Sequence, residues 1–254
     1  MRIYSAVAAV CGVVALSALT VPAAHADEQF GDTDITGVVV NDGRPVVVGT
    51  GARTVTVEVT ATDPTGLDRI NATLYHGSYL TPDATVASTG ACAATTDATT
   101  TCTLTFTLTP GTAPATDAQA GTWSVSAYAI AADGDAEFLD SAADFSVLRD
   151  SGVSVSAPKR VKWGRTVTVA GGVTNTGWAT GASVPGAAGQ SVELQFRPKG
   201  SSTFCTLKTV RTAADGTLST GVRAYGDGYY RWSYAGSATT AAALSPGAFV
   251  DVVG

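Results

Sequence analysis

The chain contains few histidines that could take part in catalysis or metal binding. The sequence contains two histidines, and the first, His25, lies in an N-terminal segment whose pattern predicts removal. His76 continues the strand-like alternation of Ile70, Ala72 and Leu74. This favours an imidazole at the end of a half-buried strand over a general base or metal ligand. Because no nucleophile elbow accompanies it, we expect a non-catalytic protein, with a small secreted hydrolase as the less favoured alternative.

The densest acidic segment is a candidate calcium site. In chain order it contains Asp133, Asp135, Glu137, Asp140 and Asp144. Carboxylate oxygens are the ligands that Ca²⁺ prefers, so Asp133, Asp135 and Glu137 are the candidate ligands of a calcium-binding, adhesion-type protein, which is the alternative to the favoured interpretation without a cofactor. The competing interpretation is a solvated turn, because the segment lacks the EF-hand order and its Asp-Gly pair is a hairpin signal. Asp63 and Asp68 form a weaker second candidate.

Two cysteines are spaced for a local disulfide. Cys92 and Cys102 flank a polar segment, and a strand-like sequence follows the second of them. In an oxidising compartment this pair is expected to form a disulfide that closes a short loop. Cys205 then has no partner in the exported chain, which favours a buried, inert thiol over an intermolecular bridge.

The N-terminal segment has the layout of a secretory signal peptide. Arg2 precedes an apolar run over residues 6–18, and Ala24-His25-Ala26 provides a small-x-small cleavage site. We therefore predict a signal peptide over residues 1–26 and a secreted, extracellular protein. The run is short for an ordinary membrane span, and no second one follows, so no membrane anchor is expected.

Charge changes sign near the middle of the chain. Residues 27–150 hold 17 acidic and 4 basic side chains, whereas residues 151–254 hold 4 acidic and 10 basic ones. Such a split predicts two domains with different surfaces that attract each other at low salt. An acidic chain with no aromatic–basic interleaving disfavours nucleic acid. An extracellular protein or a cell-wall polymer is the expected partner, and the oligomeric state stays open.

A repeated pentapeptide indicates two copies of one plan. The sequence Arg-Thr-Val-Thr-Val occurs at residues 53–57 and again at 165–169. Short alternating segments separated by turn signals predict strands at 34–40, 54–62, 69–76, 84–89, 102–109, 122–132, 143–149, 153–157, 165–173, 190–197, 203–210, 217–224, 229–235 and 247–253. About seven strands per hundred residues is typical of a β-sandwich. The predicted fold class is all-β, with two immunoglobulin-like sandwiches in tandem.

The four tryptophans divide into two pairs. Trp123 and Trp232 fall on strands of the core type, whereas Trp163 and Trp178 fall in expected loops. An exposed tryptophan can stack on a sugar or anchor a partner. The strand expected over 165–173 would place the loop tryptophans at opposite ends of the second sandwich. We therefore expect each of them to cover one end of that core.

Several motifs carry a resemblance to a known group. In the second half they are the segments 164–171, 189–197, 215–218 and 228–232, and in the first half 62–67 and 121–123. With these motifs the chain resembles secreted actinobacterial proteins with tandem immunoglobulin-like domains, most of them uncharacterised. The resemblance implies this fold and export. From the charge split we predict an acidic domain over residues 27–149 and a basic one over 150–254. The resemblance implies no catalytic residue.

Overall fold

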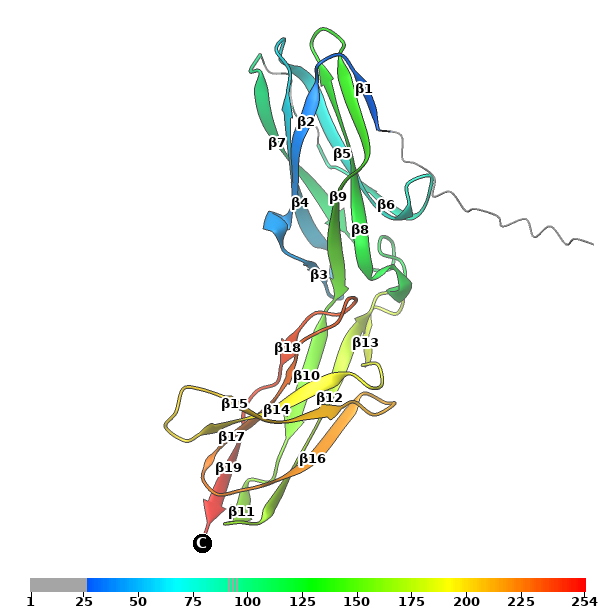
Figure 1. The fold of residues 1–254 in the computed structure, drawn as a ribbon. Helices are drawn as coiled ribbons and strands as arrows, with labels where there is room; N and C mark the ends of the chain where they lie inside the picture. Colours follow the sequence, from blue (N-terminus) through cyan, green and yellow to red (C-terminus); the bar gives the residue numbers. More distant parts are fainter. Residues whose placement is uncertain (1–26, 91, 93, 95) are drawn as a thin grey trace, which may run out of the picture.

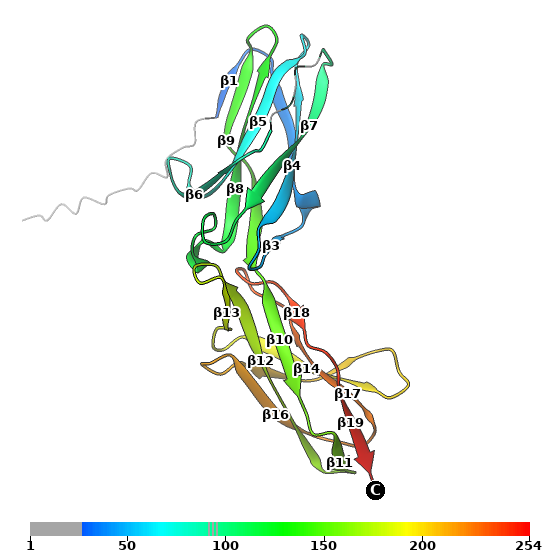
Figure 2. The same ribbon diagram turned by 180° about the vertical axis from the view of Figure 1, so that it is seen from behind.

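The molecule is built almost entirely from strands. The computed structural model describes residues 27–254 apart from 91, 93 and 95, and the predicted signal peptide, residues 1–26, lies outside the described residues. Two pairs of sheets follow each other end to end along an elongated molecule, as seen from the front in Figure 1 and from behind in Figure 2. In the described part of the chain, no helix is long and apolar enough to cross a bilayer.

The first pair of sheets contains residues 28–149, and we call residues 27–149 the first domain. One sheet has the order β1-β9-β8-β5-β6 with β3 also pairing β9, and the other has the order β2-β4-β7. The strands are β1 (Glu28–Phe30), β2 (Asp34–Val40), β3 (Val46–Val48), β4 (Arg53–Thr62), β5 (Leu67–Ser78), β6 (Thr81–Ala87), β7 (Thr99–Leu108), β8 (Gly121–Ala131) and β9 (Ala136–Arg149). Two short 3-10 turns, η1 (Asn41–Gly43) and η2 (Asp117–Gln119), lie in the connections.

Strict alternation along β4 builds the first core. Val55, Val57 and Val59 are buried between the sheets, and Thr56 and Glu58 between them face solvent. Trp123 on β8 is fully buried in the same core. Its indole nitrogen donates to the backbone oxygen of Gln119 at 2.8 Å, so the buried polar group has a partner. A period of two therefore separates core from surface, as the sequence predicts.

The second pair of sheets repeats this plan, and we call residues 150–254 the second domain. One sheet contains β10-β12-β13 with β16 on β12, and the other has the order β11-β19-β17-β14-β15 with β18 on β17. The strands are β10 (Ser151–Ser156), β11 (Arg160–Lys162), β12 (Thr166–Gly177), β13 (Ala182–Pro185), β14 (Ser191–Pro198), β15 (Cys205–Arg211), β16 (Thr217–Arg223), β17 (Gly228–Tyr234), β18 (Ala243–Leu244) and β19 (Ala248–Val253). Trp232 on β17 is fully buried in this core.

In both domains the chain crosses from one sheet to the other between two successive strands near the start of the domain. In the first, β2 pairs antiparallel with β4, and the chain then crosses so that β3 runs parallel to the last strand, β9. In the second, β10 pairs antiparallel with β12, and β11 runs parallel to the last strand, β19. The two copies of the pentapeptide lie at the start of the equivalent strands β4 and β12. The predicted fold class, two immunoglobulin-like sandwiches in tandem, is confirmed.

Every strand predicted from alternation is present. The structure adds five short ones, β1, β3, β11, β13 and β18, each of two to four residues. It also begins β9 at Ala136, seven residues before the predicted start at Ala143. Strands this short contain too few residues to display a period of two, and their partners are remote in sequence.

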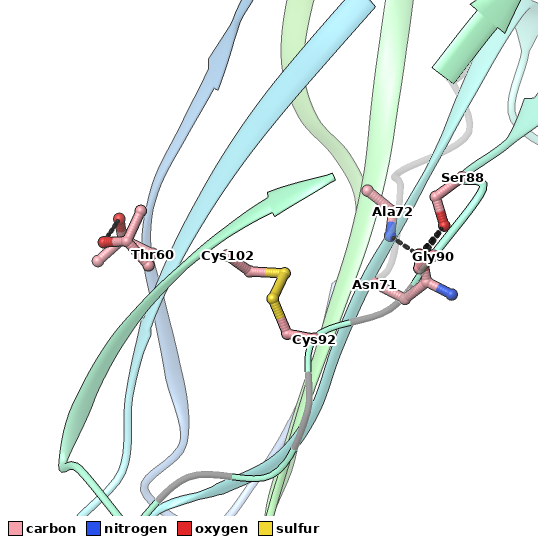
Figure 3. Close-up of a disulfide and its surroundings, with 8 residues drawn as sticks. Thr60, Asn71, Ala72, Ser88, Gly90, Cys92 and Cys102 are labelled. Atoms are coloured by element: carbon pink, nitrogen blue, oxygen red, sulfur yellow. Dashed lines mark hydrogen bonds between the residues drawn. A yellow bond between two sulfur atoms is a disulfide. The ribbon is translucent and has the colours of Figure 1, made fainter. Parts of the chain in front are cut away.

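The disulfide predicted between Cys92 and Cys102 is confirmed (Figure 3). Cys102 lies on β7 with a fully buried side chain, and the two Cα atoms are 5.8 Å apart. The connection from β6 is also joined to β7 by the backbone bond from Thr89 N to Thr105 O, at 2.8 Å. Thr89 and Cys92, between β6 and β7, are therefore both held to β7.

The interpretation of Cys205 as a buried thiol is wrong, because its side chain is exposed. Cys205 begins β15, which is the edge strand of its sheet and is exposed along almost its whole length. An edge strand has a neighbour on one side only, so alternation along it does not guarantee burial.

We predict that Cys92→Ala lowers the free energy of unfolding of the first domain by about 2–3 kcal/mol, because the unfolded chain loses a short covalent loop. Denaturant unfolding measures this, with Cys205→Ser as the matched control of unchanged stability. A thiol reagent should modify one cysteine per native chain and three after reduction and unfolding. Equal stability of Cys92→Ala and the parent would contradict the prediction.

Candidate functional site

Three carboxylates converge at the end of the first domain that lies away from the second. Asp32 lies in the β1–β2 connection, Asp63 follows β4, and Asp135 lies in the β8–β9 turn. One oxygen of each lies within 4.8 Å of the other two. Figure 1 shows these three connections together at the upper end of the molecule. We call Asp32, Asp63 and Asp135 the acidic cluster.

Asp63 is held in place by a dense set of donors. Its side chain is buried, with 1% of its surface exposed. One carboxylate oxygen accepts from Thr33 Oγ1 at 2.7 Å, and the other accepts from Thr65 N at 2.8 Å and Thr65 Oγ1 at 2.6 Å. Hydrogen bonds of this kind stabilise a buried carboxylate and fix its direction.

Asp135 packs directly against the turn that carries Asp32. Its Oδ2 accepts from the backbone nitrogen of Asp32 at 3.1 Å. Gly31, the preceding residue, has φ of +73°, and a Cβ placed there would lie 1.7 Å from the same oxygen. Glycine is therefore required at this position by both the backbone conformation and the approach of the carboxylate.

The cluster shifts two of its members in opposite directions. Desolvation and the negative charges of Asp63, Asp135 and Asp133 raise the pKa of Asp32 above its ordinary value. Burial by itself would raise the pKa of Asp63, but hydrogen bonds from Thr65 and Thr33 outweigh it and lower that pKa. The surroundings of Asp32 thus disfavour its negative charge, and those of Asp63 stabilise its negative charge.

The structure brings together only part of the predicted calcium ligands. Asp135 is in the acidic cluster, whereas Asp133 Oδ1 accepts from Asp135 N at 3.2 Å and Glu137 Oε2 accepts from Ile35 N at 2.5 Å. Of the weaker candidate pair, Asp63 joins the cluster, and Asp68 lies beside Arg69 at 4.0 Å. Asp32 was not predicted as a member of this site, because β1 has too few residues to show a strand pattern and so the turn that follows it could not be recognised.

His76 is bound as an ordinary structural histidine. Its Nδ1 lies 2.6 Å from Asp83 Oδ1, and its ring centroid lies 5.7 Å from that of Trp123. Among the hydrogen bonds of the described residues, none joins His76 to a serine, threonine or cysteine side chain. This arrangement supplies no activated nucleophile and gives the hydrolase alternative no support.

A tryptophan from the second domain completes the core of the first. Trp178 follows β12, has 1% of its surface exposed, and packs with the core residues of the first domain. Its indole nitrogen donates to Val48 O on β3 at 3.0 Å, and its backbone nitrogen donates to Asp117 Oδ1 on η2 at 2.7 Å. The expectation that Trp178 covers its own core is therefore wrong, because β12 extends far enough to reach the neighbouring domain.

Arg149, the last residue of β9, fixes the crossing point of the chain. Its backbone nitrogen donates to Thr239 O at 3.1 Å, and its backbone oxygen accepts from Ala241 N at 2.9 Å. Its guanidinium donates to Asp117 Oδ2 at 2.7 Å, the carboxylate that also holds Trp178. The junction is therefore bonded to both domains. We call Trp178, Arg149 and Asp117 the joint.

Trp163 also differs from its expected place. It follows β11 at the end of the molecule remote from the first domain, and 64% of its surface is exposed. Its ring lies against that of Tyr225, which is 61% exposed, with 5.3 Å between the ring centroids. The expectation that Trp163 covers the core is wrong, because its side chain is exposed and lies against a second exposed ring.

Comparison with known proteins gives weak structural likenesses. No family model and no curated protein matches the chain. Three domains of the outer capsid protein Hoc of bacteriophage RB49 align with 12% identity over 87% of this chain and 71% of that one, at a TM-score of 0.35. The D00-D0 domain of intimin aligns with 14% identity over 84% and 98%, at 0.30. A superoxide reductase from Ignicoccus hospitalis aligns with 13% identity over 40% and 80%, at 0.28.

Likenesses this distant establish neither a family nor a function. The resemblance to secreted actinobacterial proteins therefore stays a prediction. The structure defines the class of protein, which is a tandem of immunoglobulin-like sandwiches joined by a buried tryptophan. Its distinctive polar and aromatic groups lie at the two ends of the molecule and at the joint.

We predict that Asp32→Asn and Asp63→Asn change stability in opposite directions in chelator-treated buffer at pH 7. The raised pKa of Asp32 means that its ionised form destabilises the folded state above that pKa, so Asp32→Asn raises the melting temperature. The lowered pKa of Asp63 means that its carboxylate stabilises the folded state, so Asp63→Asn lowers it.

Both differences should shrink as the pH falls. The gain of Asp32→Asn disappears as the parent protonates Asp32 on the way down to the ordinary aspartate pKa of about 3.9. The loss in Asp63→Asn fades as the pH falls through the lowered pKa of Asp63. Thermal melts between pH 3 and pH 7 measure this, and two variants that shift in the same direction at pH 7 would contradict it.

Proposed function

We propose that the protein is a secreted, non-catalytic binding or structural module that acts as a stiff spacer at the cell exterior. The observation that carries this proposal is the joint, in which Trp178 is buried in the neighbouring domain and Arg149 is bonded on both sides. The disulfide and the predicted signal peptide support a location outside the cell. The partner we propose is an extracellular protein or a cell-wall polymer.

The joint supports a spacer because it resists bending in several directions. Hydrophobic burial of Trp178 opposes separation of the domains. The bonds of Trp178 to Asp117 and Val48, and the backbone bonds of Arg149 to Thr239 and Ala241, oppose their rotation. Asp150 adds two backbone bonds, one to Val48 at 3.1 Å and one from Thr176 at 2.8 Å. With such a joint, electrostatic attraction between the domains is not required to hold them together, so the compaction expected from the charge split should be absent.

We predict that the radius of gyration, measured by small-angle scattering, is the same at low and high salt. Trp178→Ala should broaden the distribution of interatomic distances, because the domains lose the side chain that fixes their angle. It should also destabilise the first domain by about 3–5 kcal/mol. Trp163→Ala is the matched control that leaves the scattering unchanged. A radius that rises with salt in the parent would overturn the spacer proposal.

We propose calcium binding by the acidic cluster as a second, separate role. The observation that favours it is the convergence of Asp32, Asp63 and Asp135 from three connections to within 4.8 Å. Oxygens on opposite sides of a Ca²⁺ ion are about 4.6–5.2 Å apart, so the spacing suits this ion. The cation would offset the repulsion that raises the pKa of Asp32. It would tie the β1–β2 turn to the turns that follow β4 and β8.

We predict that several millimolar Ca²⁺ raises the melting temperature relative to chelator, because a ligand that binds only the folded state stabilises it. Asp135→Asn should abolish the difference. Asp133→Asn is the matched control, since Asp133 lies in the same turn and outside the cluster. Identical melts of the parent in chelator and in Ca²⁺ would refute this role and leave the spacer proposal untouched.

A further inference from the structure

An exposed aromatic pair marks the far end of the second domain. Trp163 and Tyr225 are 64% and 61% exposed, and their rings meet edge to face with an interplanar angle of 69°. The other three tryptophans, Trp123, Trp178 and Trp232, are at most 1% exposed. Two large aromatic rings exposed side by side are unusual, because burying their apolar surface would lower the free energy of the folded chain.

The turn that carries Trp163 is rigidly held. Trp163 N donates to Val253 O, and Gly164 N donates to Ala224 O, both at 2.8 Å. Arg223 Nη1 donates to Gly164 O at 2.8 Å. Gly164 has φ of +71°, which gives the third position of this turn the left-handed conformation that glycine adopts without strain. The ring is thus presented by a fixed backbone, which reduces the entropy lost when a ligand binds.

Tyr225 also lines a groove between the sheets of the second domain. The groove has a volume of about 400 Å³ and is lined mainly by Phe196, Pro198, Leu207, Arg223, Tyr225 and Tyr230. Leu207 is 46% exposed at its rim. A volume of this size falls in the range of small-ligand sites and accommodates part of an extended polymer. Aromatic pair and groove together form one continuous surface, which we call the distal surface.

The charges around the distal surface are positive. Lys162 and Arg165 flank the Trp163 turn, Arg223 lines the groove, and all three are exposed. None of the ion pairs formed by the described residues involves these three side chains. The acid in the groove, Asp227, is neutralised by Lys199 at 3.6 Å and accepts from Val252 N at 2.8 Å.

We propose that the distal surface binds an anionic polysaccharide of the uronic-acid type. The faces of Trp163 and Tyr225 offer flat apolar surface to the C–H faces of sugar rings. When a sugar stacks on one of these two aromatic rings, the second aromatic ring contacts the edge of that sugar. The guanidinium groups of Arg223 and Arg165 offer the paired donors that carboxylates accept. This inference rests on the proposed binding role and names its ligand class.

Charge complementarity favours this occupant over a neutral glycan. Three cations without carboxylate partners lie beside the aromatic rings, whereas the first domain, at the other end, carries a large excess of acidic side chains. An anionic polymer is therefore attracted to the second domain and repelled by the first. Binding should weaken as salt screens these charges.

The test uses the mature chain, residues 27–254, and three polymers: polygalacturonate, neutral dextran and polyglutamate. Trp163 is the one strongly exposed tryptophan of the described residues, so its fluorescence reports on the site. Polygalacturonate should shift this emission to shorter wavelength and protect it from a soluble quencher. Dextran should bind at least about tenfold more weakly, because it lacks the carboxylates. Polyglutamate should bind as weakly, because it lacks the sugar rings.

Variants assign the two contributions. By calorimetry, Trp163→Ala and Tyr225→Ala should each weaken polygalacturonate binding about tenfold. The double variant Lys162→Gln with Arg165→Gln should flatten the salt dependence. Phe30→Ala, which removes an aromatic ring 56% exposed on the first domain, and Arg53→Gln are the matched controls and should bind as the parent does.

Each remaining outcome overturns the proposal. If polyglutamate binds as tightly as polygalacturonate, the distal surface binds polyanions in general and does not recognise sugar rings. Absence of binding together with self-association that Trp163→Ala abolishes would make the distal surface an interface between copies of this chain. Absence of both would refute a role for the distal surface. A chain that binds none of the polymers and still scatters as a stiff rod would leave the spacer proposal standing.

Discussion

The burial of Trp178 in the neighbouring domain is the interaction on which the architecture depends. Strand β12 pairs with β10, β13 and β16, and its last residue, Gly177, leads directly into this side chain. A buried indole needs a partner for its N–H, and the carbonyl of Val48 supplies it. That carbonyl belongs to β3, so the strand that pairs with β9 in the first domain also binds a side chain of the second.

This joint changes the meaning of the charge split. Opposite charges on two tethered domains suggest mutual attraction, but domains locked end to end keep most of those charges apart. Among the ion pairs of the described residues, none joins the two domains, and the pair of Arg149 with Asp117, at 2.7 Å, lies within the first. The charged side chains that are exposed lie on different domains, where screening limits their reach to roughly 8 Å at physiological salt. They are available to separate external partners.

The acidic cluster illustrates how one site holds carboxylates of opposite character. Asp63 is buried and fully supplied with donors, so its charge is stabilised where solvent is absent. Desolvation and the negative charges of its neighbours together disfavour the charge of Asp32. Asp63 overcomes the same desolvation because it accepts hydrogen bonds from Thr65 and Thr33. Gly31 allows the proximity of these carboxylates, because a side chain in its place would displace Asp135.

The sequence by itself determined the long strands, the repeat, the two core tryptophans and the disulfide. These depend on alternation or on short spacing, which are local properties that a sequence displays directly. Only the tertiary structure decided that β3 and β11 run parallel to the last strand of their domain. It also decided that Asp32 lies beside Asp63 and Asp135, and that Trp178 is buried whereas Trp163 is exposed. Each of these depends on which distant segments meet, and the partner of a strand end or a loop is set by the packing of the whole sandwich.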